Sequence, residues 1–466
     1  MTMKLKRFLI NGAFLTITAI ITQSLGMVFR VYMSNSIGAE AIGLYQLILT
    51  VYFFSITAVT SGINLLVTRL ATEAVALGNE HQIKMIVRKC MIVAVTVSII
   101  VGGFLFFGSE FLANNILKQS GTAMSLRVLA PSLPFIAVSA CIRGYFYAMR
   151  QVVKTAGEQL LEQISEMAVF ALLVGAMAPM GIEYACCAVA IGATASEIIT
   201  AFYSFIMYRL DIRKIKSDTS SFPIKKHLTF VALPVTLSAC LRSGLSIIEN
   251  ATIPSGLEKY GYSKSLALED YGMITGMVMP MLSFPSVVIF SFASLIIPEI
   301  SEVYAKTDKK QIKNISTNVI RVVLLFSIPI AVLFFFFGKE LGIIIYNNET
   351  AGRFICIFSA LVPVIYLDSI VDSMLKGLNE QIHYLTYNIM DSVIRVLLVL
   401  YLIPKYGIMG LVITMYIGAI FNTGLSLLRL IKVAEIKIKV LRWIVAPFVI
   451  TFLLSFTIKT IFWGNI

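Results

Sequence analysis

Long hydrophobic runs alternate with short charged links along almost the whole chain. Each run has about 20 residues, the length at which a helix crosses the hydrocarbon core of a bilayer. Runs such as 322–337 are continuously apolar, and lipid excludes open sheets, so we expect helices. The pattern predicts an all-α polytopic membrane protein with thirteen spans, at 8–33, 41–66, 90–108, 124–149, 157–177, 183–208, 228–248, 271–296, 317–338, 354–375, 384–403, 407–431 and 443–463.

The basic residues indicate how the chain is oriented. Lys and Arg are concentrated in links that share one side, and the positive-inside rule makes this side, with the N-terminus, cytoplasmic. The net charge of +13 is spread over these links rather than gathered on one domain. We therefore expect anionic membrane lipids as its partners, and no nucleic acid.

The chain repeats itself at a shift of 229 positions. Matching pairs include Glu40 with Glu269, Gly43 with Gly272, Leu66 with Leu295, Glu73 with Glu302, and 82–84 with 311–313. Parallel repeats of this kind form two lobes around a central cavity that opens to each side in turn. The predicted parts are an N-lobe at 1–210, a basic cytoplasmic linker at 211–226, a C-lobe at 227–432 and an extra C-terminal span within 433–466.

Charge inside the hydrophobic runs is the strongest functional signal. Glu158, Glu162 and Glu166 are spaced i, i+4, i+8 and form one stripe on a helix, with Arg143 in the preceding span. Two interpretations stay open for Arg143, Glu162 and Glu166: a cavity wall that faces the other lobe, or a structural pairing of arginine with glutamate. Glu158 lies near the membrane interface, and we expect it to be solvated.

Three further arginines are candidates for a cavity that binds anions. Arg242 shares a helix face with Glu249, seven residues on, and lies too deep to reach water easily, so we favour a cavity role. Arg30 lies near the outer end of the first span, where it could face either the cavity or the outer surface. Arg69 ends the second span on the inner side, where a membrane anchor is the simpler interpretation.

A second charged cluster is predicted in the C-lobe. Asp368 and Asp372 are spaced i, i+4, as are Asp391 and Arg395 on the adjacent antiparallel helix. If Asp391 pairs with Arg395, the other two carboxylates need partners, protons or a cation. Ion coupling and a structural polar network both remain open.

Motifs of catalysis and of metal binding are missing from the sequence. It has no nucleophile elbow, phosphate-binding loop or two-histidine metal helix, and its six cysteines lack metal-ligand spacing. We therefore predict a protein that is not an enzyme, with no metal and no cofactor. Transport would draw on the membrane potential or on a coupling ion, Na⁺ or H⁺.

Short motifs in a fixed order resemble the stage V sporulation protein B family of polysaccharide exporters. Arg143-Gly144-Tyr145-Phe146, then Thr155-Ala156, Gln159 and Glu162-Gln163, resemble the family pattern "RGYFQG…PTA.SQ..EQ". Segments at 62–73, 294–302 and 376–379 resemble its "GIP…SKLVAE", "SLVPAISEA" and "LQGLG" segments, and the similarity runs from residue 8 to about 430.

The resemblance implies a two-lobed flippase of the bacterial cytoplasmic membrane, related to lipid II flippases and to multidrug and toxin extrusion transporters. It implies as substrate an undecaprenyl-pyrophosphate-linked glycan, and as further partners cell-wall synthesis enzymes. By this resemblance, Arg30 corresponds to an arginine of the lipid II flippases. In those proteins, arginines that line the cavity receive the pyrophosphate. Val31, Tyr147-Ala148 and Lys154 depart from the family's usual residues, which leaves the glycan open.

The leading hypothesis is a flippase for a lipid II-type peptidoglycan precursor in a sporulating bacterium. Arg30, Arg69, Arg143 and Arg242 would bind pyrophosphate, and Glu162, Glu166 and Glu249 would gate the cavity. A cation-coupled multidrug antiporter of the same fold is the first alternative, and Arg30 and Arg242 argue against it. The second is a membrane-embedded glycan ligase or transferase, for which the outer link at 249–270 is a poor candidate.

Overall fold

The chain is helical throughout the part that the computed structural model describes: residues 3–77, 82–213, 232–289, 300–301, 303–304, 308–436 and 439–463. Ten helices in these ranges are long and apolar enough to cross a membrane. The predicted all-α membrane class is therefore confirmed. The number of spans stays a prediction, since those predicted at 228–248 and 271–296 run into residues outside the described ranges.

The first of these helices contains two predicted spans. Helix α1 (Met3–Ala76) changes direction at Gly38, where φ is 79° and ψ is 169°. Glycine adopts a positive φ at little cost because it has no Cβ. This one residue therefore lets two apolar helices follow each other without a loop.

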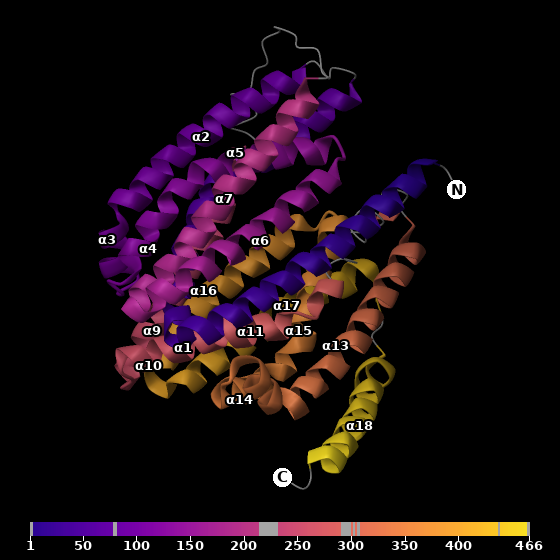
Figure 1. The fold of residues 1–466 in the computed structure, drawn as a ribbon. Coiled ribbons are helices and arrows are strands. Elements are labelled where there is room, and N and C mark those ends of the chain that lie inside the picture. The colour runs from indigo at the N-terminus through magenta and orange to yellow at the C-terminus, as the bar shows by residue number, and fades with distance from the viewer. Residues whose placement is uncertain are drawn as a thin grey trace. The chain divides into compact units, whose positions relative to one another are not determined.

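The chain divides into two compact units, of which the first is 1–29 and 36–255. In this unit, buried apolar side chains of α1, α2 and α5 pack together in one hydrophobic core. Helices α6 and α7 run side by side, as Figure 1 shows. After α1 its elements are α2 (Ile83–Phe107), α3 (Ser109–Phe111), η2 (Leu112–Ile116), α4 (Thr122–Leu129), η3 (Ala130–Ser132), α5 (Leu133–Ala148), α6 (Val152–Met177), η4 (Ala178–Met180), α7 (Ile182–Ile212) and most of α9 (Leu233–Tyr260).

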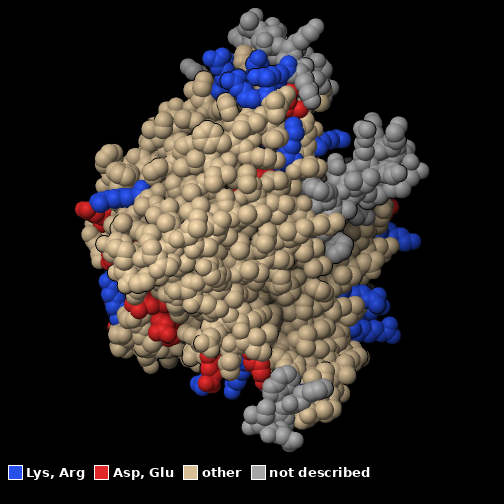
Figure 2. Space-filling model, viewed as in Figure 1, with Lys and Arg blue, Asp and Glu red and all other residues tan. Residues whose placement is uncertain are grey.

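The surface of the first unit has the charge distribution expected of a membrane protein. Basic side chains gather at the end where α2 begins and α7 ends, which carries Lys84, Arg88, Lys89, Arg209 and Arg213 (Figure 2). The flank beside it is almost free of charge in the same view, and α2 exposes large apolar side chains there. An exposed apolar flank is stable in lipid and would be a liability in water.

The second unit is 30–35 and 256–466. Its last helix, α18, packs along α13, as Figure 1 shows, and Lys459 binds the carbonyl of Phe336 and lies 3.2 Å from Glu340. Its other elements are α10 (Lys264–Gly272), η6 (Met273–Val278), α11 (Met279–Ser283), α13 (Lys309–Tyr346), α14 (Glu349–Phe358), η7 (Ser359–Leu361), α15 (Val362–Gly377), α16 (Gln381–Tyr406), α17 (Ile408–Ala434), η8 (Leu441–Val445) and α18 (Ala446–Trp463).

The repeat is visible in the helix boundaries themselves. Helices α5 and α15 begin at 133 and 362 and end at 148 and 377, each 229 positions apart. Helices α6 and α16 keep the same shift at both ends, from 152 to 381 and from 177 to 406. Lys118 and Arg150 have a positive φ, which is uncommon outside glycine. Their counterparts at that shift, Asn347 and Asn379, also have a positive φ. Such residues are uncommon, so their recurrence is strong evidence of a shared backbone path.

The lobe boundaries predicted from the repeat stay a prediction. Most of the linker predicted at 211–226 lies outside the described residues. Helix α9, which we expected to open the C-lobe, belongs to the first unit as far as Ser255. There it packs closely on α1. The two segments are so near each other that a Cβ on Gly62 would collide with Thr236 and with the carbonyl of Ala232.

Candidate functional site

Arg143 is held by two carboxylates inside the first unit. Helix α5 presents its guanidinium to α6, where Nη2 lies 2.8 Å from Glu158 Oε1 and 4.0 Å from Glu162 Oε2. Glu158 is 0% exposed, so the expectation that it would be solvated was wrong. Glu158 points into the helix packing, while Glu162 and Glu166 are half-buried. Arg143 makes the burial of the Glu158 charge tolerable.

The cluster includes two residues that the sequence analysis missed. Glu197 on α7 interacts electrostatically with Glu162, Arg143, Glu158 and Glu166. Tyr52 on α1 interacts electrostatically with Glu197, Glu166 and Glu162 and shares a 2.7 Å hydrogen bond with Ser132. Glu197 is a carboxylate inside a predicted span, which is the signal that could have found it. Arg143 thus interacts with three carboxylates, those of Glu158, Glu162 and Glu197.

Tyr145 and Phe146 of the RGYF motif contact residues of α7 and α6. The hydroxyl of Tyr145 donates to Asp211 Oδ2 at 2.9 Å, and Gln151 donates to the same oxygen at 2.7 Å. Lys154 lies 3.4 Å from Asp211 Oδ1 and over the ring of Phe146. These contacts tie α5, α6 and α7 together, so we assign Tyr145 and Phe146 a structural role.

Tyr145→Phe should lower the free energy of unfolding by about 1.5–3 kcal/mol, because it removes a buried hydrogen bond to a charged group. Unfolding of the purified protein in detergent would measure this. The matched control is Tyr147→Phe in the same motif, whose side chain is exposed and should change stability by less than about 0.5 kcal/mol. Equal effects of the two substitutions would contradict the role given to Asp211.

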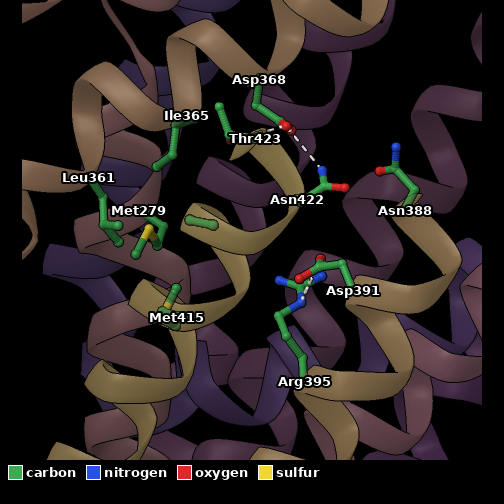
Figure 3. A pocket seen from close by; sticks show the side chains of 11 residues that line it. Met279, Leu361, Ile365, Asp368, Asn388, Asp391, Arg395, Met415, Asn422 and Thr423 are labelled. Carbon is green, nitrogen blue, oxygen red and sulfur yellow. Dashed lines mark hydrogen bonds and ion pairs between the residues drawn. The ribbon is translucent and has the colours of Figure 1, made fainter. Parts of the chain in front are cut away.

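The second unit contains a polar pocket of about 220 Å³, shown in Figure 3. Helices α15, α16 and α17 supply its polar side chains, and η7 and α11 add apolar ones. The polar lining consists of Asp368, Asn388, Asp391, Arg395, Asn422 and Thr423. Three of the four residues predicted as the second charged cluster, Asp368, Asp391 and Arg395, therefore line one pocket.

The carboxylates of this pocket region each have partners. Asp391 Oδ2 lies 3.2 Å from Arg395 Nε, the pairing that the i, i+4 spacing suggested. Asp368 Oδ1 accepts hydrogen bonds from Asn422 at 3.0 Å and Thr423 at 3.1 Å. Asp372, beside the pocket, accepts from Asn388 at 3.2 Å and Ser426 at 3.3 Å.

Two buried oxygens that line the pocket have no hydrogen-bond partner. They are Asp391 Oδ1 and Asn422 Oδ1, on residues that are 7% and 5% exposed. Hard cations prefer oxygen ligands of this kind. Among the described residues, no group of three or more His, Cys, Asp or Glu side chains could hold a metal ion, so a cation here would also use neutral oxygens.

The two charged clusters occupy equivalent positions of the repeat. At the shift of 229, Glu162 corresponds to Asp391, Glu166 to Arg395 and Arg143 to Asp372. After the three-residue turn η4, which the second unit lacks, the shift is 226, from Ile182 of α7 to Ile408 of α17. The same helices thus carry buried charge in both units, but the arginine lies on α5 in one and on α16 in the other.

Comparison with known proteins identifies the family. The model of the family described as polysaccharide biosynthesis protein matches residues 8–303. The chain belongs to this family. Stage V sporulation protein B of Bacillus subtilis (strain 168) is 26% identical over 447 residues, which cover 93% of this chain and 86% of that protein. The resemblance found in the RGYF and related motifs is thus confirmed.

The chain is also similar to proteins that are named as flippases or transporters. Lipid II flippase MurJ of the same organism is 20% identical over 488 residues, covering 98% of this chain and 88% of MurJ. A solved structure of lipid II flippase MurJ in an inward closed conformation and an inward-facing multidrug resistance MATE family transporter each match with a TM-score of 0.66 at 14% identity. The match with the MurJ structure covers 96% of this chain and 92% of that chain. The match with the MATE transporter covers 90% of this chain and 99% of that chain. These structures show the two-lobe fold, and the named relatives support a membrane flippase rather than an enzyme.

The remaining predicted site residues are dispersed over the two units. Arg69 is an exposed residue paired with Glu73 at 2.9 Å, and Arg242 on α9 is exposed while Glu249 is half-buried. Arg30 belongs to the second unit, where it is exposed and interacts electrostatically with Tyr346. The binding and gating roles of all these residues stay predictions.

Proposed function

We propose that this protein is a flippase that moves a lipid-linked glycan bearing a pyrophosphate, of the lipid II type, across the bacterial cytoplasmic membrane by alternating access. The observation that carries the proposal is a repeated helical unit with buried charge on equivalent helices, in a chain similar to MurJ over 98% of its length. Helices built only to span lipid would carry no such charge, because its burial is costly.

Exposed arginines in the spans are the best candidates for binding the pyrophosphate. A guanidinium facing hydrocarbon costs at least about 2.5–3.5 kcal/mol, so exposure within a span favours contact with water or an anion. Arg242 and Arg30 meet this condition. Arg143 does not, since Glu158 and Glu162 already neutralise it, and we assign it with Glu162 and Glu166 to shaping the site. Arg69 is bound by Glu73 and acts as an anchor.

Two sources of energy are available to such a flippase. An inside-negative potential favours outward movement of an anionic head group by about 2.3 kcal/mol per charge per 100 mV. The pocket of the second unit offers unpaired oxygens of Asp391 and Asn422 beside Asp368, which supports a site for a coupling cation. We assign ion coupling to this pocket, which leaves Arg30 and Arg242 for the substrate.

Reconstitution tests the function directly. The purified protein is placed in vesicles with labelled lipid II, and the head groups accessible from outside are measured over time under a set potential. We expect protein-dependent accessibility that rises with the potential in the outward direction. Intact lipid II that never becomes accessible, together with export of a cationic dye, would favour the multidrug antiporter instead.

A further inference from the structure

Arg395 occupies the position beside Asp391 where a cation would bind. Its guanidinium reaches back one helical turn to Asp391 Oδ2 at 3.2 Å, as Figure 3 shows. The arginine side chain is 35% exposed, whereas that of Asp391 is 9% exposed. The carboxylate is therefore buried and the cation that neutralises it lies on the open side.

Helix α17 holds Arg395 in this position by steric fit. A Cβ on Gly418 would lie 2.5 Å from Arg395 Cδ, 2.8 Å from its Cγ and 2.9 Å from Asp391 Oδ1. Glycine at this position therefore leaves the space that the arginine stem needs. The stem has four rotatable bonds and can leave this space without any movement of the backbone.

The pocket keeps oxygen ligands that Arg395 does not use. The Nδ2 amide of Asn422 donates a hydrogen bond to Asp368. The oxygens Asn422 Oδ1 and Asp391 Oδ1 then have no hydrogen-bond donor. A buried acceptor without a hydrogen-bond partner destabilises the fold. A cation coordinated by both oxygens would remove this penalty.

The charge of the region also leaves room for a cation. The region contains three carboxylates, Asp368, Asp372 and Asp391, and one arginine, which pairs with Asp391, on helices α15 and α16. In the first unit the equivalent of Asp372 is Arg143, whose Nη2 lies 2.8 Å from Oε1 of the fully buried Glu158. That arginine is a fixed part of the fold, whereas Arg395 borders an open pocket.

We propose that Arg395 is a tethered cation that alternates with a free monovalent metal cation of the sodium class on Asp391. When the metal ion binds Asp391 and Asn422, the guanidinium leaves the carboxylate. When the ion departs, Arg395 returns and keeps Asp391 neutralised. The exchange prevents a bare buried carboxylate at any step, which would otherwise be costly. This inference rests on the ion coupling assigned to the pocket under the proposed function.

Binding of ²²Na⁺ to the purified full-length protein tests the exchange. Arg395→Gln removes the competing charge, and we expect the apparent affinity for Na⁺ to rise at least tenfold. Gly418→Ala keeps the charge and crowds the stem of Arg395, at 2.5 Å, more closely than Asp391 Oδ1, at 2.9 Å, so it should raise the affinity in the same direction. Arg395→Lys should stay closer to the unchanged protein, and Asp391→Asn should abolish binding.

The outcomes separate the exchange from the wider function. Unchanged or weaker Na⁺ binding in Arg395→Gln and Gly418→Ala, with binding lost in Asp391→Asn, would keep the ion site and overturn the alternation. No ²²Na⁺ binding by any variant would overturn both the exchange and sodium coupling, and lipid II flipping driven by potential alone would still be measured independently. Gly418→Ala also serves as the test if Arg395→Gln fails to fold.

Discussion

Arg143→Met should lower the free energy of unfolding by about 3–5 kcal/mol, because it leaves a buried carboxylate without its partner. Glu158 is 0% exposed, and its Oε1 lies 2.8 Å from the guanidinium that the substitution removes. Glu162, Glu166 and Glu197 lie nearby and add repulsion rather than relief. Denaturant or thermal unfolding of the purified protein in detergent measures the change.

Two controls make the stability result specific. The double variant Arg143→Met, Glu158→Leu should recover most of the loss, because an apolar pair can replace a buried ion pair at little cost. Arg353→Met breaks an exposed pair with Glu349 on one helix and should cost no more than about 0.5 kcal/mol. A loss below about 1 kcal/mol for Arg143→Met would mean that the pair is not essential to the first unit.

Arg242→Ala should reduce lipid II flipping by about 10–100-fold, since a hydrogen bond to a charged group contributes about 1.5–3 kcal/mol. The residue is exposed on α9 and lies within the span predicted at 228–248. Arg242→Lys keeps the charge but loses the paired geometry that suits phosphate, so an intermediate rate is expected. The vesicle assay with labelled lipid II gives the rates.

The matched control for this substitution is Arg353→Ala, another exposed arginine that already has a carboxylate partner. Its flipping rate should stay close to that of the unchanged protein. If Arg242→Ala flips lipid II at the full rate, Arg242 has no part in substrate binding. The pyrophosphate would then have to be bound elsewhere, and Arg30 would be the next residue to substitute.

The two charged clusters of the repeat, around Arg143 and around Arg395, use buried charge differently. In the first unit the arginine lies on α5 and is paired inside the helix packing. In the second unit the arginine lies on α16 and borders a pocket with unpaired oxygens. A fixed ion pair supports specificity of packing, whereas a pair that lines a pocket can exchange with a ligand. Equivalent helices of the repeat therefore support different roles.

Local pattern was enough to predict much of this protein. Hydrophobic runs of about 20 residues predict membrane helices, because a helix forms the backbone hydrogen bonds that lipid cannot provide. The shift of 229 appeared in the residue types and recurs in the boundaries of α5, α6, α15 and α16. The pairing of Asp391 with Arg395 followed from the helical spacing of four, because both ends lie on one helix.

Contacts between helices were decided only by the tertiary structure. The burial of Glu158, the addition of Glu197 and Tyr52 to its cluster, and the role of Asp211 all join separate helices. So do the hydrogen bonds that turn Asn422 Oδ1 into the pocket. Helical periodicity states which residues share a face, but the distance and rotation of the neighbouring helix determine what that face meets. The sequence by itself therefore determined which helices carry charge and which charges can pair within one helix. Packing decided which charges pair between helices and which line an open pocket.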